Sequence, residues 1–166
     1  MDNNEQAIQT LRDLFSSQIQ AVLATEHQHQ PYTSLMAFTA SDDLRRLLFA
    51  TYRNTHKYHN LLANPRAAML IDNRSGQSSD HYGGIAVTAT GQVREVSETD
   101  RDRLIALHLA RHPTLAEFLT APACALMALQ VARYYIVSQF HNVTELRIAQ
   151  MDNPPELSPP EQAINR

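Results

Sequence analysis

The clearest pattern in the chain is an alternation of side chains between Ile85 and Val93. Apolar residues or glycine occupy every second position, and the residues between them are polar or small. Successive side chains of a strand point to opposite faces of its sheet. The pattern therefore predicts one long strand with a single buried face.

Further stretches are rich in apolar and β-branched residues and are bounded by polar, Gly or Pro residues, which is typical of strands. They are Ile19–Thr25, Tyr32–Phe38, Leu47–Thr51, Ala67–Ile71 and Ala125–Phe140, and Val143–Ile148 can add a short one. The first three follow one another with short polar connections, so we expect them to form a β-meander.

Helical spacing appears in four places. Apolar residues share one face between Asn3 and Ser17, a short amphipathic segment runs from Asn54 to Ala63, and residues 98–111 and Leu115–Leu119 complete the set. Most strands have no helix between them, which argues against a parallel doubly wound fold. We therefore predict a mainly β protein with flanking helices, built on a six-stranded antiparallel barrel.

Length and composition place limits on the protein. We expect one domain over residues 1–150, followed by a loosely ordered tail at 151–166 that holds four of the prolines. A net charge of −3 gives no general attraction to nucleic acid or to an anionic membrane. No apolar run is long enough to span a bilayer, and the N-terminus lacks the order of a signal peptide. With Cys124 as the single cysteine, the expected compartment is the cytoplasm.

The segment from Leu47 to Arg74 carries the strongest candidate chemistry. Between an apolar run and a short helix lies a polar turn with Arg53, Thr55 and Lys57, the only lysine of the chain. Helix N-termini present unpaired N–H groups, and hydroxyl and cationic side chains bind phosphate. The turn is therefore a candidate phosphate site; the alternative is a capped helix with solvated charges.

Other chemistries find less support in the sequence. His108 and His112 have the spacing of two metal ligands on a helix, but no third ligand has a fitting position, and we assign no metal site. The adjacent Asp42 and Asp43 lie in a turn, where solvated acidic residues are common. With four glycines and no glycine-rich phosphate loop, side chains and a helix start must hold any phosphate.

The ordered segments PYTSLMAF, LLFATYRNTHKYHNL, NPRAAMLIDNR and IAVTATGQV resemble the pyridoxamine 5'-phosphate oxidase-like FMN-binding split-barrel family over roughly residues 8–145. The resemblance implies a split barrel that binds FMN at a homodimer interface. It also implies that Thr55 and Lys57 hold the FMN phosphate and that Thr51 approaches the flavin. Arg53 can add a second cation, and the alternative is a solvated surface arginine.

The resemblance extends to positions outside the turn. Ser34, Leu35 and Met36 match the strand whose backbone lies along the flavin ring, although a plain core strand is the alternative. Arg74 can face the phosphate or the flavin edge, or can be a loop charge. Phe140 and His141 lie where the family brings side chains to the flavin, or are purely structural.

One departure limits the functional expectation. True pyridoxamine phosphate oxidases carry a C-terminal tryptophan–arginine segment for their substrate, and this chain has no tryptophan. We therefore expect an FMN-dependent oxidoreductase of unknown substrate and electron donor, with no catalytic side chain assigned, rather than an enzyme of vitamin B6. The alternatives are a non-catalytic flavin or haem carrier and an F420-type reductase on the same scaffold.

Overall fold

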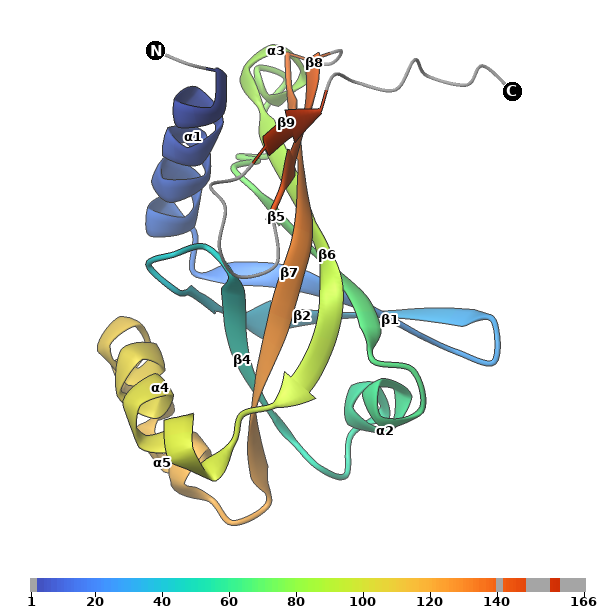
Figure 1. Cartoon of the computed structure of the whole chain (residues 1–166), viewed down its shortest axis with the longest axis vertical. Helices are drawn as coiled ribbons and strands as arrows, with labels where there is room; N and C mark the ends of the chain where they lie inside the picture. The colour runs from blue at the N-terminus through green and yellow to red at the C-terminus, as the bar shows by residue number, and fades with distance from the viewer. Residues whose placement is uncertain (1–2, 140–141, 149–155, 159–166) are drawn as a thin grey trace.

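The computed structural model describes residues 3–139, 142–148 and 156–158 (Figure 1). The helices are α1 (Asn3–Ser17), α2 (His56–Ala63), α3 (Asp80–Gly83), α4 (Glu98–Arg111), the 3-10 turn η1 (Pro113–Leu115) and α5 (Ala116–Thr120). The strands are β1 (Gln20–His27), β2 (Gln30–Ala37), β3 (Thr39–Ala40), β4 (Arg46–Tyr52), β5 (Arg66–Asp72), β6 (Ile85–Glu95), β7 (Cys124–Ser138), β8 (Asn142–Arg147) and β9 (Glu156–Ser158). None of the described helices is long and apolar enough to cross a membrane.

The strands form one strongly curled antiparallel sheet in the order β2-β1-β5-β6-β7-β4-β3, with β8 on β7 and β9 on β8 (Figure 1). This confirms the predicted split barrel and its flanking helices. The six predicted barrel strands are β1, β2, β4, β5, β6 and β7. The described sheet also holds the two-residue β3 and the short β8 that the sequence suggested. It holds β9 as well, which lies inside the predicted tail, and the rest of 151–166 falls outside the described residues.

The expected β-meander is wrong in its second half. β1 and β2 form a hairpin with an eight-residue register, but β4 pairs with β3 and β7 rather than with β2. The chain turns at Phe38, which is fully buried and packs edge-on against Phe15 of α1. This bend carries the strand from one edge of the sheet to the other, so β2 and β3 lie at opposite edges although one residue separates them.

A bulge lies in the middle of the β6–β7 pair. Thr90 faces Arg133 and Gly91 faces Val131, which leaves Ala132 without a partner in β6. A Cβ atom at Gly91 would lie 1.9 Å from the carbonyl oxygen of Gln130, so only glycine fits opposite the bulge. Because side chains alternate along a strand, the extra residue exchanges the two faces of β7 at this point.

Two apolar cores pack against the two faces of the sheet. The larger lies between the sheet and α1 and receives Val131, Tyr134 and Ile136 from β7, on both sides of the bulge. The smaller lies between α4, α5 and the sheet and receives Leu126 and Ala128 from the opposite face of the strand. The unbroken apolar run at the start of β7 therefore reflects burial on both faces.

The C-terminal half of α4 braces the bend of the chain. The His108 Nδ1 atom lies 2.9 Å from the Thr39 hydroxyl, and the His112 Nε2 atom lies 2.7 Å from the Phe38 carbonyl oxygen. Between them, Arg111 donates to carbonyl groups at the end of α1. The two histidines that suggested a metal pair instead hold β2, β3 and α4 together.

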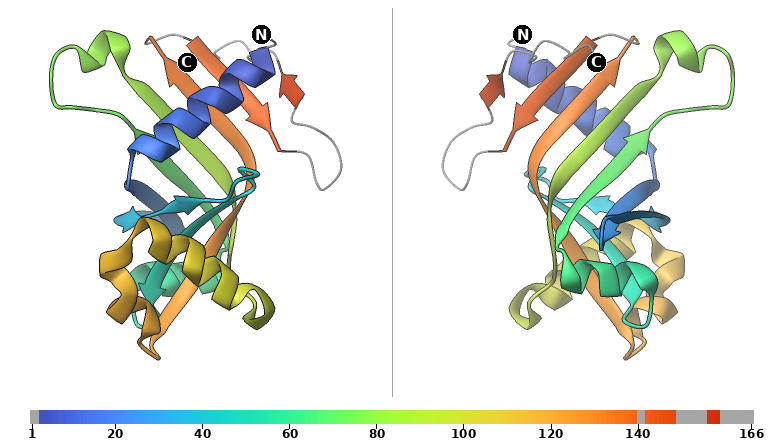
Figure 2. Two further views of the ribbon diagram at one scale, coloured as in Figure 1. Left: turned by 90° about the vertical axis from the view of Figure 1, so that its left-hand side faces the viewer. Right: turned by 90° about the vertical axis from the view of Figure 1, so that its right-hand side faces the viewer.

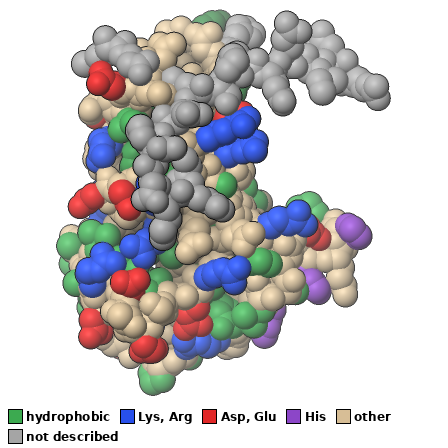
Figure 3. Space-filling view, in the orientation of Figure 1, with side chains coloured by type: hydrophobic (Ala, Val, Ile, Leu, Met, Phe, Trp, Pro, Cys, Tyr) green, Lys and Arg blue, Asp and Glu red, His purple; other side chains and the backbone are tan. Residues whose placement is uncertain are grey.

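On the sheet face opposite α1, α4 and α5 cover the first half of β7, but no described helix lies over β5, β6 and the second half of β7. Viewed from the right of Figure 1, these parts of the strands are bare, whereas α1 crosses the opposite face (Figure 2). Alternation and register place small and apolar side chains on this uncovered face, among them Leu35 and Val143, which are 64% and 43% exposed. The β1–β2 hairpin projects beyond the barrel at its side, and histidines gather there and over α2 below it (Figure 3).

Candidate functional site

The predicted phosphate turn joins β4 to α2. Thr55 occupies the N-cap position of α2 with extended backbone angles, but its side chain does not cap the helix. Its hydroxyl donates to the Tyr52 carbonyl oxygen at 2.8 Å and lies 2.9 Å from the Thr51 hydroxyl. The first N–H groups of α2 are therefore uncapped by this side chain, which is the condition for binding an anion.

Lys57 lies in the first turn of α2 and is half-buried. It forms no ion pair with any described carboxylate. Partial burial lowers the pKa of Lys57, because removing water disfavours the charged form. A half-buried cation without a counter-ion among the described residues favours an external anion.

Arg53 contacts its own chain. Its guanidinium forms an ion pair with Glu95 at the end of β6 and donates to the carbonyl oxygens of Pro122 and Cys124 at 3.0 and 3.3 Å. The hydrogen bond that Arg53 donates to the Glu95 carboxylate raises the pKa of Arg53. The Tyr58 hydroxyl donates to the same carboxylate at 3.2 Å, so Arg53 braces the turn against the neighbouring strands.

The strand predicted to lie along the flavin is β2. It pairs only with β1 in the described sheet, so half of its backbone N–H and C=O groups point away from the sheet. Met36 is a core residue, Leu35 lies on the uncovered face, and the buried Ser34 hydroxyl has no hydrogen-bond partner among the described residues. The open edge and the unpaired hydroxyl leave polar groups available to a ligand.

A ring contact connects β2 with the turn. Tyr32 stacks on His56, the first residue of α2, with ring centroids 4.5 Å apart and planes 8° apart. Tyr32 lies on the same face of β2 as Ser34 because the two are separated by one residue. The structure thus brings Ser34, Thr51, Thr55 and Lys57 into one region.

Arg74 does not join this region within one chain. It follows β5, whereas α2 precedes that strand, and a seven-residue strand spans roughly 20 Å. Arg74 pairs with Asp72 at 2.8 Å and lines a cavity of about 300 Å³ beneath the loop that carries α3. Phe140 and His141, for which the sequence leaves a flavin contact or a structural role open, lie outside the described residues.

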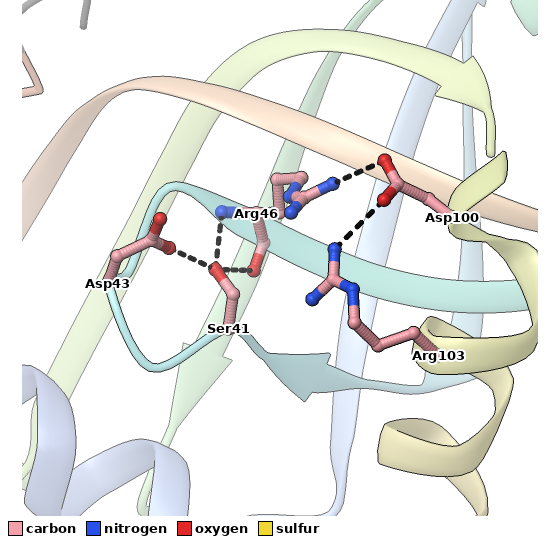
Figure 4. Close-up of polar contacts among 5 residues, drawn as sticks. All are labelled: Ser41, Asp43, Arg46, Asp100 and Arg103. Atoms are coloured by element: carbon pink, nitrogen blue, oxygen red, sulfur yellow. Dashed lines mark hydrogen bonds and ion pairs between the residues drawn. The ribbon is translucent and has the colours of Figure 1, made fainter. Parts of the chain in front are cut away.

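A second group of charged side chains, here called the α4 cluster, comprises Ser41, Asp43, Arg46, Asp100 and Arg103 (Figure 4). Arg46 and Arg103 both contact the Asp100 carboxylate, at 3.6 and 3.0 Å. The Ser41 hydroxyl donates to Asp43 at 2.6 Å. The cluster borders a cavity of about 420 Å³, but its charges already pair with one another.

The sequence comparison identifies the family. The family model described as pyridoxamine 5'-phosphate oxidase matches residues 7–138, which is most of the chain. The chain belongs to the pyridoxamine 5'-phosphate oxidase family. No curated protein matches the sequence.

Solved structures share the fold of this family member at low identity. A protein of unknown function from Agrobacterium tumefaciens has a TM-score of 0.71 at 20% identity, with 81% of this chain and 57% of that chain covered. A heme binding protein from Mycobacterium smegmatis has a TM-score of 0.71 at 17% identity, with coverage of 81% and 55%. A FAD-binding protein from Mesorhizobium loti has a TM-score of 0.62 at 17% identity, with coverage of 78% and 90%. The chain thus spans little more than half the length of the first two.

Two residues beside the predicted phosphate turn and a partner of Arg53 could not be found from the sequence. Tyr32 was assigned to a strand and His56 to a helix, and only alternation along β2 hints that Tyr32 shares the face of Ser34. Glu95, the partner of Arg53, is 42 residues away in the sequence and gives no signal before the β6–β7 pairing is known.

Proposed function

We propose that this chain binds FMN at the edge of the barrel and serves as an FMN-dependent oxidoreductase. The observation that carries the proposal is Lys57, a half-buried cation at an uncapped helix start that pairs with no carboxylate of the described part of the chain. Membership of the pyridoxamine 5'-phosphate oxidase family supports a phosphate-bearing ligand here. The FAD-binding structural neighbour supports a flavin on this fold, and the heme-binding neighbour keeps a haem protein as the competing function.

The residues of the region fit FMN. Lys57, the Thr55 hydroxyl and the α2 N–H groups would hold the phosphate, with the Thr55 hydroxyl rotating away from the Tyr52 carbonyl to donate to it. Residues Ser34–Met36 and Thr51 would lie along the ring system through their backbone groups. Arg53 would act mainly by holding the turn in place. FMN supplies the hydride or electron transfer when bound, and the protein supplies orientation and access.

A homodimer belongs to the proposal. The uncovered sheet face exposes Leu35 and Val143, and a second copy would bury them. In such a dimer the two uncovered faces would pack against each other about a two-fold axis perpendicular to the strands. The start of β5 in one copy would then lie near the end of β5 in the other. In such a dimer the partner's Arg74 would approach the FMN phosphate that Lys57 holds.

Titration of the purified chain with FMN, riboflavin and haemin tests the cofactor. The expected result is a flavin spectrum and tighter binding of FMN than of riboflavin, since riboflavin lacks the phosphate. Equal affinities, or binding of haemin alone, would overturn the FMN assignment. Reduction of the bound flavin by NADH or NADPH in a stopped-flow experiment would distinguish an oxidoreductase from a carrier.

Sedimentation of a variant tests the dimer. Val143→Arg places a charge on the uncovered face and should yield a monomer with weakened FMN binding. The matched control is Gln9→Arg on the exposed side of α1, which should remain a dimer. A wild-type chain that sediments as a monomer with FMN bound would contradict the dimer and leave the phosphate site intact.

A further inference from the structure

The two halves of the proposed site are carried by parts of the fold that are joined weakly. β1 pairs with β5 only over Val22–Ala24, yet the β1–β2 hairpin continues to the turn before Gln30. The far half of the hairpin therefore projects without a neighbouring strand beyond β1 (Figure 1). Such an arm bends relative to the barrel unless something else holds it.

Contacts with α2 hold the arm. Near the end of the helix, the Asn60 side chain donates to the Thr25 hydroxyl at 3.1 Å, and the Asn64 side chain donates to Glu26 at 2.7 Å. At the start of the helix, Tyr32 of the arm stacks on His56. His56 stands between Thr55 and Lys57, and Tyr32 stands two residues before Ser34.

We propose that the Tyr32–His56 stack is a positioning device that sets the spacing between the flavin-facing strand and the phosphate-binding turn. This inference rests on the proposed function and concerns how that site prefers FMN to riboflavin, which lacks the phosphate. Two rings 4.5 Å apart and 8° from parallel fix both separation and tilt. Preference for FMN over riboflavin needs the ring and the phosphate to be satisfied at once, so a small change in this spacing weakens it.

The test compares the riboflavin-to-FMN ratio of dissociation constants in five proteins: wild type, Tyr32→Ala, Tyr32→Phe, His56→Ala and the double variant with both alanines. Loss of the stack in either alanine variant should lower the ratio about fivefold, and Tyr32→Phe, which keeps the ring, should retain it. The ratio should fall no further in the double alanine variant than in each single variant, because both substitutions remove the same contact.

Other outcomes overturn the inference. A purely structural stack would lower the melting temperature and leave the ratio unchanged. A direct phosphate contact by His56 alone would leave Tyr32→Ala with the wild-type ratio. If wild type shows no preference for FMN, the proposed function fails and this inference with it. A wild-type preference that all variants retain refutes the inference alone.

Discussion

The α4 cluster and the turn from Thr51 to Lys57 both present cations beside polar side chains, but only the turn leaves a cation unpaired. In the α4 cluster, two guanidinium groups share the Asp100 carboxylate (Figure 4). In the turn, Arg53 is bound by Glu95 while Lys57 has no described counter-ion. Positive residues alone therefore do not indicate an anion site; the absence of an internal partner does.

Removing the unpaired cation should have the largest effect. Lys57→Met keeps the length of the side chain and removes the charge-assisted contact to phosphate, which should weaken FMN binding by about 2–3 kcal/mol. Fluorescence titration measures this loss. Riboflavin affinity should stay constant, and Arg46→Met in the α4 cluster serves as the matched control with unchanged FMN affinity. Equal losses from both variants would remove the distinction between the two regions.

The buried histidine pair adds a second kind of polar atom to the comparison. The His108 Nε2 atom has no hydrogen-bond partner among the described residues, and burial together with His112 lowers the pKa of His108 to about 4. Unfolded histidine, with a pKa near 6.5, binds protons between these values while the folded residue does not, so stability falls with acidification across this window and levels off below it. From pH 7 to 5 the expected cost is about 2 kcal/mol.

Urea denaturation at several pH values measures this acid sensitivity. His108→Gln cannot protonate, so its stability should depend less on pH between 7 and 5 than that of the wild type. A wild-type curve that runs parallel to the variant's would show that His108 is not the group that titrates.

Arg53 provides a paired cation inside the turn itself. Arg53→Met leaves the carbonyls of Pro122 and Cys124 without this donor and Glu95 without its cation. Because the side chain is partly exposed, the expected loss of stability is about 1 kcal/mol. FMN affinity should fall much less than in Lys57→Met; a larger fall would mean that Arg53 contacts the phosphate directly.

Disrupting the α4 cluster should have the smallest effect. Asp100→Asn removes two ion pairs in which Asp100 and Arg103 are largely exposed, and exposed pairs of this kind contribute little. Neither the urea midpoint nor the FMN affinity should change measurably. A clear drop in FMN affinity would indicate that the cluster takes part in binding after all.

Local patterns predicted most of the elements of this fold. Alternation from Ile85 to Val93 gave β6, and apolar spacing gave α1 and α4. Pairing between distant segments was harder to predict. Nothing in the local sequence of Tyr32–Phe38 indicates that the chain bends at Phe38, so that β3 lies at the opposite edge of the sheet from β2. Burial of that aromatic ring against α1 decides the bend, and it depends on the whole core.

The candidate site was predictable to the extent that its residues are adjacent in sequence. Thr55 and Lys57 stand in one turn, and the structure leaves Lys57 unpaired. The ion pair of Arg53 with Glu95 depends on strand pairing, which charge and spacing do not encode. The separation of Arg74 from Lys57 follows from the length of β5, which lies between them. Roles for these residues in cofactor binding stay predictions.

The bulge in β7 has a consequence for which changes the strand tolerates. Ala132 is exposed and faces no residue of β6, so exchanging it for another small residue should hardly be noticed. Deleting it would instead turn every later side chain of the strand over, moving Tyr134 and Ile136 out of the interior. Position 132 should therefore tolerate substitution but not deletion. Related sequences should differ in the residue at this position and should keep the same number of residues in the strand.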